Sequence, residues 1–167
     1  MNFPLLPVWV TETVTDVEPS FFQKHGYQLV MLDFDNTLLP YTTNKPEQAV
    51  VNWLDRLKGE GLKVCIVSNS HKPRVPDFCR EYGIDCITGA RKPFPSGIRQ
   101  CLAHYDIPSE RAVLIGDQIY TDTLGGNCAG VDTILVRSID NHNFWLKLRH
   151  MAERPFIFFA RKRRISS

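Results

Sequence analysis

The sequence lacks any hydrophobic run long enough to cross a membrane, and it has no internal repeat and no low-complexity segment. A helix that spans a bilayer needs about 20 consecutive apolar residues. The first ten residues (MNFPLLPVWV) contain two prolines and no positive charge, so they do not resemble a signal peptide. We therefore expect a soluble, cytoplasmic protein that contacts a membrane at most peripherally, on its inner face.

The cysteine pattern and the small net charge exclude further classes of protein. The five cysteines are an odd number and include no CxxC pair, which argues against a disulfide framework and against a zinc site. A chain of this kind suits a reducing compartment. The formal net charge of +2 is too small to indicate a polyanionic partner by itself, and no nucleic acid is expected.

Short apolar runs recur along the 167 residues and predict a parallel sheet. The runs are rich in Val and Ile, do not alternate strictly with polar residues, and lie at 29–34, 62–67, 85–88, 112–115 and 133–136. This composition is typical of strands buried on both faces. The length and an ordinary hydrophobic content of 43% predict one domain over residues 1–167, with a core at about 28–137.

Segments with helical spacing separate these runs, at 46–58, 73–82, 96–105 and 121–129, and a further helix is predicted at 19–24. The first of them should have Pro46 in its first turn and Gly59 as its C-terminal cap. Strands that alternate with helices indicate βαβ units with right-handed crossovers. The predicted fold is therefore a doubly wound, mainly parallel α/β sheet flanked by helices, of the Rossmann-like kind.

Polar side chains follow the predicted strands at their carboxyl ends, where ligands bind in an open α/β sheet. These are DFDNT at 33–37, SNS at 68–70, RKP at 91–93, GD at 116–117 and TD at 121–122. Because the carboxyl ends of parallel strands meet at one edge of the sheet, we expect the five segments to converge there.

The side chains of these segments have consistent chemistry. Asp33, Asp35 and Asp117 would repel one another unless a cation lay between them. Oxygen ligands with no nearby His or Cys favour Mg²⁺. A carboxylate can also act as a covalent nucleophile and form an aspartyl phosphate. Ser68 and Lys92 could then supply a hydroxyl group and a positive charge to the phosphoryl oxygens.

In order and in placement, these segments resemble the four motifs of the haloacid dehalogenase (HAD) superfamily. The motifs are DxDxT at 33–37, a Ser at 68, a Lys at 92 and GDxxxxD at 116–122. The resemblance implies that Asp33 is the nucleophile and a Mg²⁺ ligand. It implies that Asp35 is the general acid and then the general base, with its backbone carbonyl reaching the metal. An aspartate at that position favours a phosphatase over a dehalogenase.

The resemblance also implies roles for the remaining motif residues. Ser68 and Lys92 would bind the phosphoryl group, and Asp117 would ligate Mg²⁺. Phosphate binding is further expected from Thr37 and Asn69, and support of the site from Gly116 and Asp122. The five histidines show no metal spacing, and only His71, which follows Ser68–Ser70, is a candidate to face the site.

Members of this superfamily commonly carry a cap domain, and this sequence leaves no room for one. The loop at 38–45 and the interval at 89–91 are too short. An open site suits bulky substrates such as lipids, proteins or nucleic acid ends, or a site closed by a neighbouring subunit in an oligomer.

The runs DFDNTLLP, SNS, KP and GDQIYTDTLGGN resemble subfamily IIIA, the YqeG-type phosphatases, which includes phosphatidylglycerophosphate phosphatases. A C-terminal helix and tail are expected at 141–167. Residues 154–164 (RPFIFFARKRR) combine aromatic and basic side chains that would suit an anionic phospholipid surface, although packing on the domain explains them equally well. Two alternatives stay open: a soluble phosphatase for nucleotides, sugar phosphates or nucleic acid ends, and a non-catalytic binding module.

Overall fold

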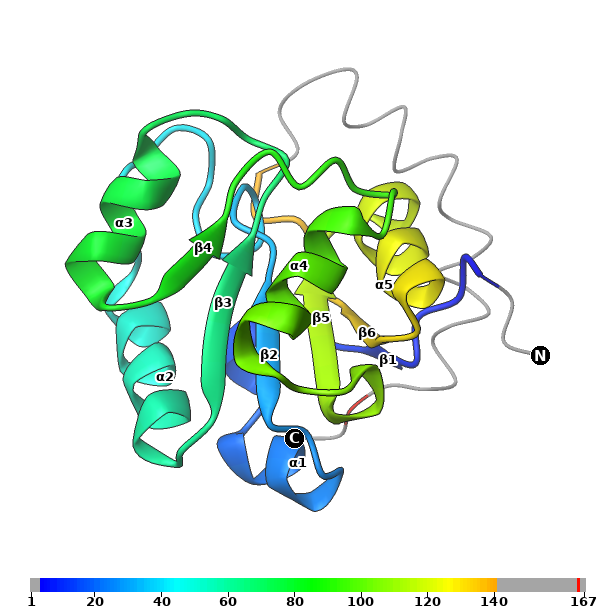
Figure 1. Ribbon diagram of the computed structural model, residues 1–167. Helices are drawn as coiled ribbons and strands as arrows, with labels where there is room; N and C mark the ends of the chain where they lie inside the picture. The colour runs from blue at the N-terminus through cyan, green and yellow to red at the C-terminus, as the bar shows by residue number, and fades with distance from the viewer. Residues whose placement is uncertain (1–3, 141–164, 166–167) are drawn as a thin grey trace.

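The chain forms a six-stranded, entirely parallel sheet with helices on both faces (Figure 1). The computed structural model describes residues 4–140 and 165. The strand order is β1-β6-β5-β2-β3-β4, with bounds β1 (Trp9–Val10), β2 (Leu29–Leu32), β3 (Lys63–Val67), β4 (Asp85–Ile87), β5 (Ala112–Gly116) and β6 (Asp132–Leu135). Helices α1 (Pro19–Lys24), α2 (Gln48–Gly59), α3 (Arg74–Tyr82), α4 (Ser96–Tyr105) and α5 (Leu124–Ala129) connect or precede the strands.

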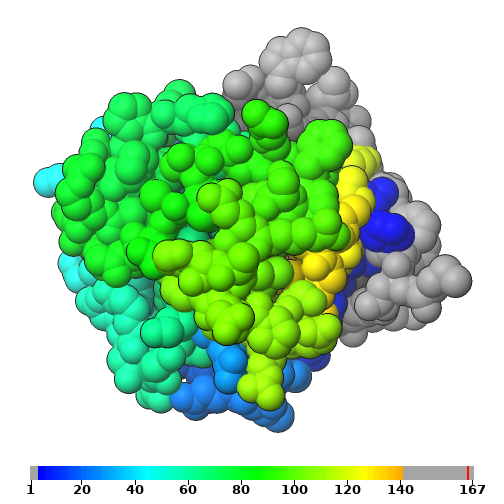
Figure 2. Space-filling view, in the orientation of Figure 1, coloured from blue at the N-terminus to red at the C-terminus, as the bar shows by residue number. Residues whose placement is uncertain are grey.

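Alternation along the central strand divides the core between the two faces of the sheet. In β2, Val30 and Leu32 pack with buried residues of α1, α2 and α3, whereas Leu29 and Met31 pack with buried residues of α4. All four side chains are fully buried, as the apolar run predicts for a strand covered on both faces. In the space-filling view, α4 and its neighbouring loops cover the face turned to the viewer (Figure 2).

The predicted fold class and strands are confirmed, with three local differences. Strand β1 pairs with β6 but has only two residues, too few to produce a sequence pattern. Helix α2 begins at Gln48, so Pro46 lies before it, and Gly59 is its last residue and not its cap. The left-handed turn falls at Gly61 instead, with φ 79°. A π-helical turn, Ile119–Thr123, occupies the start of the helix predicted at 121–129.

The connections that could carry a cap domain are short. Residues 33–47 lead from β2 to α2, residues 88–95 lead from β4 to α4, and neither stretch contains an inserted domain. Within the described residues, no helix is both long and apolar enough to cross a bilayer. The predicted C-terminal helix and the basic-aromatic segment 154–164 lie outside the described residues. Ile165 is described, and its backbone N–H donates a hydrogen bond to the Val10 carbonyl at 3.0 Å.

Candidate active site

Two neighbouring strands deliver the first two carboxylates of the site. Asp33 follows β2 directly, and Asp117 follows β5, its neighbour in the sheet. The backbone N–H of Asp33 donates to the Ile115 carbonyl at 2.9 Å, which extends the ladder between the two strands. The third carboxylate, Asp122, lies in the π-helical turn after β5. The predicted convergence at the carboxyl edge of the sheet is thus seen directly.

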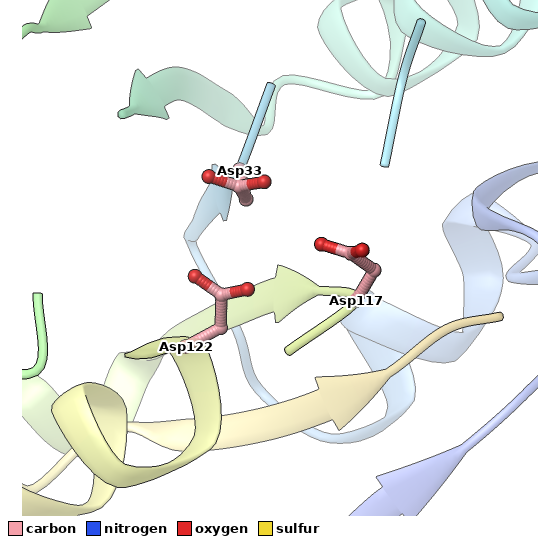
Figure 3. Close-up of side chains that lie close together, drawn as sticks. All are labelled: Asp33, Asp117 and Asp122. Atoms are coloured by element: carbon pink, nitrogen blue, oxygen red, sulfur yellow. The ribbon is translucent and has the colours of Figure 1, made fainter. Parts of the chain in front are cut away.

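Asp33, Asp117 and Asp122 form a buried carboxylate cluster in which one oxygen of each lies within 4.8 Å of the others (Figure 3). Lys92, on the loop between β4 and α4, contributes the cation in contact with it. Its Nζ donates to Asp33 Oδ1 and to Asp122 Oδ1, both at 2.7 Å, and its side chain is 1% exposed. One buried ammonium thus contacts two of the three carboxyl groups in the cluster.

The pKa shifts show that this charge balance is incomplete. Burial, reinforced by the charges of Asp33 and Asp122, raises the pKa of Asp117 well above its ordinary value. Burial also raises the pKa of Asp122 to about 6, although Lys92 opposes the change. Burial disfavours the charged form of Lys92, but the two carboxylates outweigh it and raise the Lys92 pKa. Among the described residues, Asp117 Oδ2 has no hydrogen-bond partner. The cluster therefore fits a divalent cation.

Thr37, predicted to bind phosphate, lies between two of the carboxylates. Its hydroxyl is 3.3 Å from Asp33 Oδ2 and 3.4 Å from Asp117 Oδ1, and the residue is buried. A hydroxyl has one proton to donate, so it can satisfy either carboxylate but not both at once. Thr37 is therefore placed to set the spacing of Asp33 and Asp117.

Asn69, also predicted to bind phosphate, orients the lysine. Its side-chain amide donates to the Lys92 carbonyl at 2.8 Å and accepts from the Lys92 N–H at 2.7 Å. Ser68 precedes it, and the Ser68 Oγ accepts a hydrogen bond from the Ser70 N–H at 3.1 Å. The Ser68 hydroxyl proton remains available to a phosphoryl oxygen.

A cavity of about 240 Å³ opens next to the cluster, lined by Asp33, Asp35, Tyr41, Ser68, Asn69, Ser70, Lys92, Gln118 and Thr121. Asp33 and Asp35 both reach it because the residue between them, Phe34, turns into the hydrophobic core. The Asp35 carboxylate is not part of the cluster and pairs instead with Arg74, at 3.3 Å. Burial raises the Asp35 pKa, while Arg74 opposes that change.

Gly116 has a steric role in this arrangement. A Cβ at this position would overlap the carboxyl group of Asp122. The absence of a side chain therefore allows the π-helical turn to bring Asp122 onto Lys92. His71 does not line the cavity: it is exposed, and its ring lies against Gly89.

Comparison with known proteins identifies the family. A family model described as HAD-hydrolase-like matches residues 89–155. The probable phosphatase YqeG of Bacillus subtilis is 32% identical over 153 residues, which cover 91% of this chain and 89% of the relative. The chain belongs to the HAD-like hydrolases. With relatives named as phosphatases and with this site, it is a phosphatase.

Two further comparisons of this HAD-like phosphatase concern a more distant sequence relative and a solved structure with a similar fold. Glyceraldehyde 3-phosphate phosphatase of Pyrococcus furiosus is 25% identical over 113 residues, which cover 62% of this chain but only 46% of the relative. The cobalt-bound deoxy-D-mannose-octulosonate 8-phosphate phosphatase of Haemophilus influenzae superposes with a TM-score of 0.55 at 14% identity, over 78% and 89% of the two chains.

Several residues of the HAD-like phosphatase site carry no sequence signal of their own. Arg74 lies at the start of α3 with no motif around it, and Tyr41 lies in the loop after β2. Gln118 falls within the variable positions of GDxxxxD, and the spacing of that motif could have indicated it, since a turn between Asp117 and Asp122 must face the same cavity. Thr121, of the TD pair at 121–122, also lines the cavity.

Proposed function

We propose that this HAD-like phosphatase is a Mg²⁺-dependent phosphomonoester hydrolase that forms an aspartyl-phosphate intermediate on Asp33. The observation that carries the proposal is the buried carboxylate cluster with its ammonium partner, Lys92, beside an open cavity. Phosphoryl transfer needs chiefly alignment and charge neutralisation, and this arrangement supplies both.

In the proposed reaction, side chains of this protein provide the attacking oxygen and transfer each proton. An Asp33 carboxylate oxygen attacks phosphorus, and the bond to the leaving oxygen breaks while Asp35 donates a proton to that oxygen. Asp35, now a carboxylate, removes a proton from water, which attacks the aspartyl phosphate and releases phosphate and free Asp33. Ser68 and Lys92 bind the phosphoryl oxygens. The raised pKa of Asp35 favours the protonated form needed for the first step.

In this proposal Asp33, Asp117 and the backbone carbonyl of Asp35 hold Mg²⁺. When bound, the ion neutralises charge between these carboxylates and the phosphoryl oxygens. Asp117 Oδ2, which is buried and has no hydrogen-bond partner among the described residues, supports a cation-binding position next to it.

Mg²⁺ is expected to stabilise the metal-free protein against thermal unfolding. A ligand present at 100 times its dissociation constant adds about 2.7 kcal/mol to the free energy of unfolding. Differential scanning fluorimetry with a Mg²⁺ titration measures the shift. Asp117→Asn should lose most of it because it removes a charged ligand. Asp77→Asn, which alters only a surface pair with Arg80, should keep it. An unchanged melting temperature in the wild type would contradict the metal assignment.

We further propose phosphatidylglycerophosphate as the substrate, with peripheral membrane contact through residues 154–164. The uncapped, open cavity and the resemblance of the motifs to subfamily IIIA support this substrate. The relationship to glyceraldehyde 3-phosphate phosphatases favours the alternative, a small soluble phosphate ester.

Phosphate release from a matched panel separates these two substrates. The panel contains phosphatidylglycerophosphate in mixed micelles, glyceraldehyde 3-phosphate, nucleoside monophosphates and sugar phosphates. The lipid is expected to give a kcat/KM at least about 100-fold above the soluble esters, a difference of about 2.7 kcal/mol in transition-state binding. Efficient turnover of a soluble ester with the lipid left untouched would reject the lipid and leave the phosphatase mechanism intact.

A further inference from the structure

Arg74 is held in one orientation by contacts on several sides. It is the first residue of α3, and its side chain is 12% exposed. Its guanidinium donates to three carbonyls of one loop: Nη2 to Pro40 at 3.1 Å and Thr43 at 2.8 Å, and Nη1 to Tyr41 at 3.3 Å. The guanidinium carbon also lies 5.1 Å from the centre of the Phe34 ring, within cation–π range. An arginine held by this many contacts keeps its guanidinium in one position and can orient a neighbouring carboxylate.

The same guanidinium reaches Asp35. Nη1 lies 3.3 Å from Asp35 Oδ1, and both side chains are largely buried. Asp35 also feels the repulsive charge of Asp33 and the attraction of Lys72 and Lys92. Of the described basic groups, Arg74 is the one within ion-pair distance of the Asp35 carboxylate. Without it, repulsion from Asp33 would favour rotation of the Asp35 carboxylate away from its present place.

The contact with Arg74 orients the Asp35 carboxylate without forming a hydrogen bond to it. Asp35 Oδ1 and Arg74 Nε are both buried, and neither has a hydrogen-bond partner within the described part of the chain. The carboxylate is thus oriented by charge at Oδ1, and the residue still lines the cavity where it would exchange a proton with substrate or water. A general acid must be oriented in this way, and it must not be held in a hydrogen bond that blocks proton transfer to the substrate.

The loop held by Arg74 belongs to the same cavity. Tyr41, in the middle of that loop, lines the cavity together with Asp35. The three carbonyl contacts therefore tie one wall of the cavity to the same guanidinium that orients the acid. In an enzyme with no cap domain between β2 and α2, this loop is the chain's own cover next to Asp35.

We propose that Arg74 is a positioning residue that aims the Asp35 carboxylate at the leaving oxygen and fixes the 40–43 loop beside it. The inference rests on the proposed role of Asp35 as general acid. Arg74 itself exchanges no proton and forms no bond to the substrate.

Leaving-group dependence tests this role, since a good leaving group needs little help from an acid. The substrates are 4-nitrophenyl phosphate and phenyl phosphate, which have similar shapes but differ in leaving ability. Arg74→Met is expected to lower kcat about 10- to 100-fold for phenyl phosphate and less than about 3-fold for 4-nitrophenyl phosphate. Arg74→Lys retains a charge without the three carbonyl contacts and should recover part of the phenyl phosphate rate.

Two further variants make each outcome interpretable. Arg80→Met removes an exposed arginine of the same helix, which pairs with Asp77 at the surface, and should leave both rates unchanged. Asp35→Asn should show the same leaving-group discrimination as Arg74→Met, or more. If Asp35→Asn discriminates and both Arg74 variants slow the two substrates equally, or slow neither, the positioning role is overturned. If Asp35→Asn does not discriminate, the general acid itself is wrong, and the inference is overturned with it.

Discussion

Replacing Asp33 by Asn is expected to abolish turnover, with kcat lower by at least about 10⁴-fold, as when the nucleophile of other covalent enzymes is removed. The amide keeps the size and shape of the carboxylate but is a very poor nucleophile toward phosphorus. Lys92 keeps its contact with Asp122, so the fold should survive the change. Release of 4-nitrophenol under saturating substrate measures the loss.

Trapping the intermediate makes this experiment specific. Acid quenching of the wild type during turnover of a ³²P-labelled ester should leave label on the protein that hydroxylamine removes, whereas Asp33→Asn should carry none. Asp55→Asn is the matched control because Asp55 lies on the surface of α2, in a pair with Lys58. A labelled Asp33→Asn protein would place the nucleophile elsewhere. Absence of turnover in the wild type, with Asp33→Asn changing nothing but metal affinity, would favour the non-catalytic binding module.

Replacing Lys92 by Met is expected to damage stability and activity together. The change removes the one cation within ion-pair distance of Asp33 and Asp122 among the described residues and leaves both carboxylates buried. Breaking a buried pair in this way costs about 3–5 kcal/mol of unfolding free energy. Loss of the charge next to the transferring phosphoryl group should lower kcat about 10²- to 10³-fold. Urea unfolding and steady-state kinetics measure the two effects.

A half-buried lysine of α2 provides the comparison. Lys58 pairs with Asp55 at 3.0 Å and donates to the Tyr82 carbonyl at 2.9 Å, and its replacement by Met should cost no more than about 1–2 kcal/mol. Equal unfolding midpoints for the Lys92 and Lys58 variants would show that Lys92 does not offset the charge of the cluster. An unchanged kcat in Lys92→Met would remove its role in phosphoryl binding.

The fold and the centre of the site could be predicted from sequence because both depend on local patterns. Buried parallel strands leave short apolar runs, and Asp33 and Asp117 follow two such runs directly. Strand β1 could not be predicted, since two residues become a strand only through pairing with β6. Asn69 could be predicted as a residue of the site, but its two hydrogen bonds with the Lys92 backbone depend on how two separate loops meet.

The contacts of Arg74 could not be predicted from local sequence patterns. Its partners lie in a loop more than 30 residues earlier in the chain, and no spacing rule connects the start of a helix to those carbonyls. Asp35 presents the same difficulty. Its place in DxDxT indicated a carboxylate at the site, but only the folded chain shows that this carboxylate faces an arginine and is not part of the buried carboxylate cluster.

The position of β2 in the middle of the sheet also bears on how the protein forms during synthesis. One neighbour, β3, follows it closely in the chain, but the other, β5, begins only at Ala112. A nascent chain that ends before Ala112 exposes one unpaired edge of β2, with apolar side chains that are fully buried in the finished protein. Asp33, the proposed nucleophile, is therefore made early but gains its neighbouring carboxylates late, and the carboxylate cluster of the ribosome-bound chain is incomplete until Asp122 has emerged.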